Sequence, residues 1–158
     1  GYAAGVDISK DILKMAVVER HKNTRHIGIG YLKGYGLKSG AVATSVAHDS
    51  HNIICVGTND EDMAFAVNRI ARNRGGIVVV ENGQVLAELP LEIAGIISGK
   101  PLREVNTLLE GAKKAAHALG VGTDIDPFMT LSFMSLPVIP TLRLTTRGVV
   151  DVNTQQYV

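Results

Sequence analysis

The chain has 158 residues, 46% of them hydrophobic, and its 16 basic and 15 acidic residues leave a net charge near +1. This length and apolar content suit one folded domain with its own core, while the near-neutral charge provides no long-range attraction for nucleic acid or for an anionic membrane. No stretch approaches the roughly 20 consecutive apolar residues of a membrane span, and the first residues lack a signal-peptide pattern, so we expect no nucleic-acid partner, no membrane partner and a cytoplasmic location.

The chain begins at Gly1 rather than at Met. We interpret residues 1–158 as a single domain from a longer polypeptide. The one cysteine, Cys55, lies in an apolar run, where a small buried thiol is the usual interpretation. A lone cysteine also suits a reducing compartment.

The first two predicted elements are strands. Residues 12–19 are rich in Leu, Met and Val, and residues 25–33 alternate apolar side chains with glycines. The glycines near the second strand do not form a dinucleotide or phosphate loop, because neither the Gly-x-Gly-x-x-Gly spacing nor Gly-Lys-Ser/Thr occurs. They instead indicate bulges or close backbone approach in a curved sheet.

Two further strands are predicted around a polar cluster. Residues 40–47 and 53–57 are apolar, as buried strands are. Between them lie five polar residues, which we call the polar segment: His48, Asp49, Ser50, His51 and Asn52. This is the one place where several groups able to transfer protons or bind metals occur together.

A helix, a hairpin and a second helix are predicted next. Residues 58–74 combine a capping Thr58 or Asn59 with three acidic residues in the first turn, where the helix dipole favours negative charge. Asn82-Gly83 joins two short apolar runs and is a strong hairpin signal. Pro101 opens the longest predicted helix, which ends at Gly120. Its expected apolar stripe comprises Leu102, Val105, Leu108, Leu109, Ala112, Ala115, Ala116 and Leu119.

The last part of the chain is apolar and punctuated by Pro127, Pro137 and Pro140. We expect an extended, packed segment here, followed by short strands and a frayed tail over residues 153–158. The order of elements predicts an α+β fold: a mixed or antiparallel sheet with about two main helices packed on one face.

The polar segment allows four interpretations. Two imidazoles and a carboxylate can bind metal, but the His-Glu-x-x-His pattern is absent and one cysteine cannot form a Cys-x-x-Cys pair. Ser50 could be a nucleophile beside Asp49, although no Gly-x-Ser-x-Gly elbow is present. Alternatively, the polar side chains bond a turn, or they face a substrate in a larger site. The residues alone leave these interpretations open.

Several stretches match one known family, in order along the chain. The centre of the similarity is residues 30–64, which include Ser-Val-Ala-His-Asp-Ser-His-Asn at residues 45–52. Supporting stretches are Gly-Gly at 75–76 with Val-Val-Val at 78–80, Leu-Ala-Glu-Leu-Pro-Leu at 86–91, Asp-Pro-Phe-Met-Thr-Leu-Ser-Phe at 126–133 and Leu-Pro-Val-Ile-Pro at 136–140. The chain thus resembles the C-terminal region of bacterial and archaeal adenine deaminases.

The resemblance implies an amidohydrolase-type enzyme of purine salvage that hydrolyses adenine to hypoxanthine and ammonia by a metal-activated water. In such proteins the metal centre, typically manganese or iron, lies in an α/β barrel upstream of this region. Its His-x-His pair and later ligands have no counterpart in this chain. The resemblance therefore carries over no catalytic or metal-binding residue.

We expect a C-terminal domain that packs on the catalytic barrel of the same polypeptide, holds no metal itself and is inactive alone. The polar segment would lie near the active-site mouth. The alternative is a non-catalytic scaffold whose apolar residues 128–140 mediate domain packing or a homo-oligomer. A weaker alternative is a module that binds a small molecule by itself.

Overall fold

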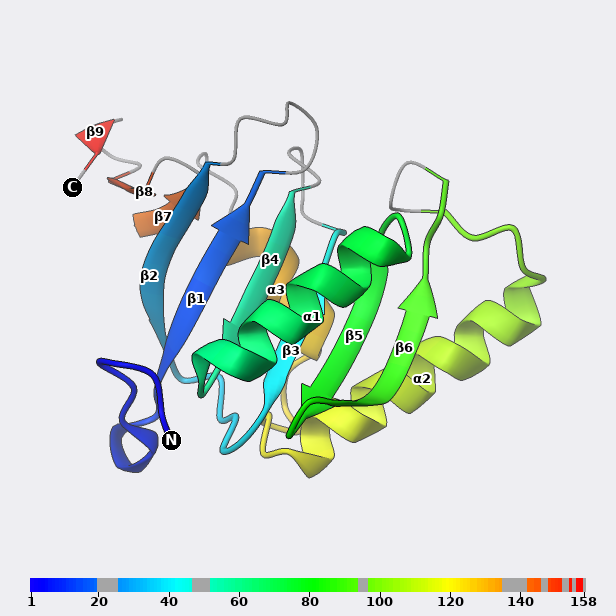
Figure 1. Ribbon diagram of the computed structural model, residues 1–158, viewed down its shortest axis with the longest axis horizontal. Coiled ribbons are helices and arrows are strands. Elements are labelled where there is room, and N and C mark those ends of the chain that lie inside the picture. Colours follow the sequence, from blue (N-terminus) through cyan, green and yellow to red (C-terminus); the bar gives the residue numbers. More distant parts are fainter. Residues whose placement is uncertain are drawn as a thin grey trace.

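The computed structural model describes residues 1–19, 26–46, 52–93, 97–134, 142–145, 148–151, 154 and 156–157. Its main unit is a six-stranded sheet with the strand order β2-β1-β4-β3-β5-β6, in which every neighbouring pair is antiparallel (Figure 1). The strands are β1 (Ile12–Val18), β2 (Ile27–Lys33), β3 (Ala41–Thr44), β4 (Ile53–Gly57), β5 (Gly76–Glu81) and β6 (Gln84–Pro90), and a short 3-10 helix, η1 (Ile8–Lys10), precedes them. The predicted α+β class and antiparallel sheet are confirmed.

The helices lie on both faces of the sheet, so the expectation of two helices on one face is wrong. Helix α1 (Asp60–Arg72) packs against β3, β4 and β5 and shares a core with the alanines of β3. Helices α2 (Leu102–Ala118) and α3 (Pro127–Met134) share the opposite core with Val42, Ile54 and Val79 (Figure 1). The central strands β3 and β4 are therefore buried on both sides along their whole length.

Local sequence signals explain α1 and the β5–β6 hairpin. Asn59 is the N-cap of α1, and its side-chain oxygen accepts the N–H of Asp62 at 2.8 Å. The helix ends before Gly75, whose N–H reaches the carbonyl of Ile70 at 2.8 Å. In the hairpin, Asn82 and Gly83 both have positive φ, as a two-residue type I′ turn requires.

Helix α3 replaces the expected extended segment. Pro127 is its first residue, a position where the missing N–H of proline costs nothing. The carboxylate of Asp126 accepts the N–H groups of Phe128 and Met129, both at 3.0 Å, and so caps the helix. Phe128 and Leu131 are buried in the core, whereas Met129 is 56% exposed. Residues 135–140 lie outside the described residues.

The C-terminal residues form a second, three-stranded sheet of β7 (Leu142–Thr145), β8 (Gly148–Asp151) and β9 (Gln156–Tyr157). β9 pairs antiparallel with β8, so the expectation of a frayed tail is wrong for these residues. β7 and β8 lie next to β2 (Figure 1).

The pairing of β1 with β2 is uninterrupted from the Ile12–Lys33 pair to the Val18–Ile27 pair, so Gly28 and Gly30 do not mark a bulge. Both glycines are buried. No helix among the described residues is long and apolar enough to cross a membrane.

Candidate functional site

The polar segment belongs to the connection between the two central strands. Of its five residues, His48, Asp49, Ser50 and His51 lie outside the described residues, and Asn52 is half-buried immediately before β4. The connection leaves β3 after Thr44 and returns at Ile53, because Thr44 pairs with Ile54 in the sheet. Both ends of the candidate site are thus fixed by the centre of the fold.

Two buried hydroxyls hold the chain where it leaves β3. The N–H of Val46 donates to Thr44 Oγ1 at 3.0 Å, which turns the chain out of the strand. Ser45 Oγ accepts the N–H of Gly76 at 2.8 Å, while the N–H of Ser45 donates to the carbonyl of Gly76 at 2.9 Å. Both side chains are fully buried, so they are structural anchors rather than groups that a solute can reach.

A third hydroxyl comes from far along the chain. Ser132 Oγ on α3 lies within hydrogen-bonding reach of the carbonyl of Val46 and of the carbonyl of Phe128, the latter at 2.9 Å. A serine hydroxyl carries one proton, so it donates to one of these carbonyls at a time. Through this contact α3 supports the start of the 47–51 connection.

An apolar cavity of about 260 Å³ lies beside this start, between the sheet and helices α2 and α3. Its polar groups are Ser132 and the ion pair of Lys113 with Asp126, whose atoms are 3.1 Å apart. The lining residues are Val46, Ile77, Leu89, Leu91, Val105, Leu109, Lys113, Asp126, Phe128, Met129 and Ser132.

The charges at this cavity are committed to the fold. Burial alone would raise the pKa of Asp126, but the N–H groups of Met129 and Phe128 and the Lys113 ammonium together lower it. The hydrogen bond to Asp126 in turn raises the pKa of Lys113. Both groups therefore stay ionised at neutral pH, and neither has the near-neutral pKa of an efficient general acid or base.

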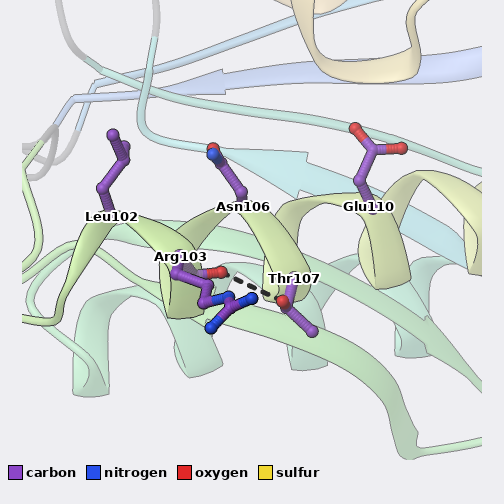
Figure 2. A pocket seen from close by; sticks show the side chains of 5 residues that line it. All are labelled: Leu102, Arg103, Asn106, Thr107 and Glu110. Carbon is purple, nitrogen blue, oxygen red and sulfur yellow. Dashed lines mark hydrogen bonds between the residues drawn. The ribbon is translucent and has the colours of Figure 1, made fainter.

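A larger hollow, of about 640 Å³, lies on the outer side of α2. Figure 2 shows Leu102, Asn106 and Glu110 in one row along the helix, with Arg103 and Thr107 in a neighbouring row. The Thr107 hydroxyl donates to the carbonyl of Arg103 at 3.0 Å, a bond within the helix. Every lining residue comes from this one helix and is exposed, so no groups converge there from different elements.

Leu102 itself is 75% exposed. Its predicted place in the buried stripe of α2 is therefore wrong, because the helix extends beyond the sheet at this end. The rest of the stripe lies in or against the core.

No group of three or more His, Cys, Asp or Glu side chains that could hold a metal occurs within the described part of the chain. Among the described residues there is thus no donor set that fits the metal centre of an amidohydrolase, and we assign no step of such chemistry to them.

No local sequence pattern indicates Ser132 as a support of the 47–51 connection, since 86 residues separate it from Val46. Thr44 and Ser45 lie inside the apolar run predicted over residues 40–47, at the end of the observed strand β3. Two hydroxyl side chains within an otherwise apolar run are the sequence pattern that could have identified Thr44 and Ser45 as anchors.

Comparison with known proteins matches residues 2–156 to the family described as the adenine deaminase C-terminal domain. The chain belongs to this family. The resemblance expected from residues 30–64 and from the later stretches is therefore confirmed.

Individual adenine deaminases agree with this membership. The chain is 53% identical over 152 residues to the adenine deaminase of Listeria welshimeri and 47% identical over 152 residues to that of Bacillus subtilis, in each case covering 96% of this chain. It is 54% identical over 147 residues to that of Nitratidesulfovibrio vulgaris, covering 92% of this chain. The chain spans only 26% of the length of each of these relatives.

Proposed function

We propose that this chain is the C-terminal domain of an adenine deaminase, and that the polypeptide containing it hydrolyses adenine to hypoxanthine and ammonia. The observation that carries the proposal is the family match over residues 2–156. In addition, the relatives are named adenine deaminase, and this chain corresponds to about 26% of their length. An activity in purine salvage and a cytoplasmic location follow from the same proposal.

The proposed catalytic centre lies in the region outside this chain. A metal there, manganese or iron, would supply the activated water. The described residues of this domain contribute no metal ligand set, so the proposal assigns them support and positioning. We accordingly expect residues 1–158 alone to be inactive on adenine.

We further propose that the polar segment faces the adenine site from this domain. The support for this proposal is that both ends of the segment are held by the fold. The buried hydroxyls of Thr44 and Ser45 hold the chain before the segment, and the central strand β4 begins directly after it. A segment that only closed a hairpin would need two to five residues rich in Gly, Asn or Asp, not two histidines. The imidazoles of His48 and His51 are the side chains that would bind or orient the purine.

The test is adenine turnover by the polypeptide that carries both this domain and the region preceding it. We expect His48→Ala or His51→Ala to lower kcat/KM by about tenfold or more at an unchanged melting temperature. His26→Ala is the matched control, because His26 is an exposed histidine beside the same end of the sheet. Unchanged turnover in both test variants, or a loss that follows the melting temperature, would make the polar segment a structural turn.

The scaffold alternative predicts a different result. Phe128 and Leu131 are buried and unavailable to a partner, so the exposed side chain that the described part offers such a surface is Met129. If the domain only stabilises its neighbour, the histidine variants retain full turnover. Stabilisation of the isolated chain by adenine in a melting experiment would instead favour an independent binding module.

A further inference from the structure

Strand β2 carries three of its large apolar side chains on one solvent-facing side. Ile27, Ile29 and Tyr31 are 55%, 45% and 55% exposed. Gly28 and Gly30, which alternate with them along the strand, are buried. A half-buried strand normally places its large apolar residues inward. Three large apolar side chains at alternate positions on the exposed side of a strand are typical of a surface that packs against another protein surface.

This apolar β2 face, formed by Ile27, Ile29 and Tyr31, is not covered by any helix that the structure describes. In the register of β1 and β2, Tyr31 lies opposite Lys14 and Ile29 lies opposite Ala16, which places the three residues on the side of the sheet that carries α1. Helix α1 packs on β3, β4 and β5 (Figure 1), and its first residue, Asp60, forms a 2.7 Å ion pair with Lys14 of β1.

The start of the chain lies beside this face. The Tyr31 hydroxyl donates to the carbonyl of Ala4 at 3.0 Å, and a Cβ at Gly5 would lie 2.7 Å from the same hydroxyl oxygen. Ala3 is fixed in turn by its N–H, which donates to the carbonyl of Thr58 at 2.8 Å. A polypeptide that continues upstream of Gly1 therefore leaves the domain next to Tyr31.

The other end of the face lies near the 47–51 connection. Ile27 pairs with Val18, and Val18 pairs with Ile53, the first residue of β4. A partner lying along the face from Tyr31 to Ile27 thus extends from the chain entry to the edge of the sheet where the polar segment is attached.

We propose that the apolar β2 face, formed by Ile27, Ile29 and Tyr31, is the surface on which the preceding region of the same polypeptide packs. The inference rests on the proposed function, because it requires this domain to follow a longer region. The family is that of a C-terminal domain, and the chain spans 26% of its relatives, so that region is about three times as long as the domain itself. The apolar β2 face is therefore covered by this preceding region and not by a second copy of this chain.

Thiol labelling tests the proposal. Cysteine is introduced as Ile29→Cys and, as a matched control on the far edge strand, as Leu86→Cys, since Leu86 is 46% exposed and Ile29 is 45% exposed. Native Cys55 is fully buried, and burial raises the pKa of its thiol, so it stays unlabelled in the folded domain. Each variant is made in residues 1–158 alone and in the polypeptide with the preceding region, and labelling is mapped to each site by peptide mass.

We expect Ile29→Cys to label about tenfold more slowly in the longer polypeptide than in the isolated chain, while Leu86→Cys labels equally in both. Ile27→Cys provides a second variant in case Ile29→Cys lowers the melting temperature. Equal labelling of the β2 variants in both polypeptides would overturn the proposal. Protection in the isolated chain that grows with its concentration would also overturn it, in favour of a second copy. Adenine turnover is measured on the same samples. The proposed interface and the proposed activity are thus tested separately, and one can be contradicted while the other is supported.

Discussion

The carboxylate of Asp62 accepts the backbone N–H of Gly83 at 2.9 Å, which ties the first turn of α1 to the tip of the β5–β6 hairpin. The same carboxylate accepts the N–H of Asn82 at 3.2 Å and the Asn59 side-chain amide at 3.0 Å. Asp62 is 3% exposed. One buried acid therefore satisfies donors from two elements, a stronger role than the favourable placement at a helix N-terminus that the acidic triplet predicts.

Removing this carboxylate is expected to destabilise the domain. Asp62→Ala removes the acceptor of three partly buried hydrogen bonds, so we expect the free energy of unfolding at pH 7 to fall by about 1–3 kcal/mol. Glu61→Ala is the control, because Glu61 is exposed in the same helical turn. Urea unfolding measures both variants, and an equal loss in the two would show that Asp62 acts only through helix charge.

The contribution of Asp62 also depends on pH. Burial alone would raise its pKa, but the bonds from Asn59, Gly83 and Asn82 lower it below the ordinary value. A lowered folded-state pKa gives stability that is present above the unfolded value, about 3.9, and is lost as the pH falls through the folded value. The stability difference between the wild type and Asp62→Ala should therefore shrink in acid below about pH 4. A difference that stays constant down to acid unfolding would contradict this.

The anchor at Ser45 gives a prediction for the ends of the polar segment. Ser45→Ala leaves the N–H of Gly76 without its acceptor in a buried site, so we expect a loss of about 1–3 kcal/mol in unfolding free energy. Thr107→Ala is the control, since Thr107 is exposed on α2, and its effect should be within about 0.5 kcal/mol. Equal effects would show that Ser45 is not an anchor. If the polar segment faces the purine, Ser45→Ala should also lower adenine turnover in the longer polypeptide.

Two glycines should respond in opposite directions to alanine. Gly40 has φ +75°, and an added Cβ would lie 2.2 Å from the carbonyl oxygen of Val80, so Gly40→Ala should cost about 3 kcal/mol or more. Gly111 lies inside α2 with nothing within 4 Å of an added Cβ, so Gly111→Ala should add about 0.5–1 kcal/mol. Thermal melting of both variants is sufficient. A stable Gly40→Ala variant would contradict the close approach of the backbone at β5.

Cys55 should report global unfolding. Its thiol is fully buried and its pKa is raised by burial, so we expect no reaction with a thiol reagent at pH 8 in the native state. In denaturant the reaction should follow the loss of circular dichroism. Fast labelling of the native chain would show local opening of β4.

Local signals predicted the elements well and their arrangement less well. The runs at residues 12–19 and 53–57, the Asn82-Gly83 turn and the cap at Asn59 each carry their information within a few residues, and the structure confirms all four. Helix α3 differs from the expected extended segment, because proline breaks a helix only in its interior, and an aspartate before a proline is also the pattern of a capped first turn.

The placement of helices on both faces could have been inferred in part. β3 and β4 are continuous apolar runs without alternation, and such runs indicate burial on two sides. The sequence could not show which side of β2 faces solvent, because the alternation of Ile27, Ile29 and Tyr31 with glycines has no direction until the neighbouring strands are placed. The contact of Ser132 with Val46 depends on a fold closure across 86 residues and left no local signal.

The central position of β3 and β4 has a dynamic consequence. Each is hydrogen-bonded to strands on both edges and covered on both faces, whereas β2 and β6 end the six-stranded sheet. Amide protons of the two central strands should therefore exchange with solvent only when the whole domain unfolds, while those of the edge strands exchange through smaller openings. The residues at which the polar segment joins the sheet should then keep their positions as long as the domain stays folded, even while the edge strands open locally.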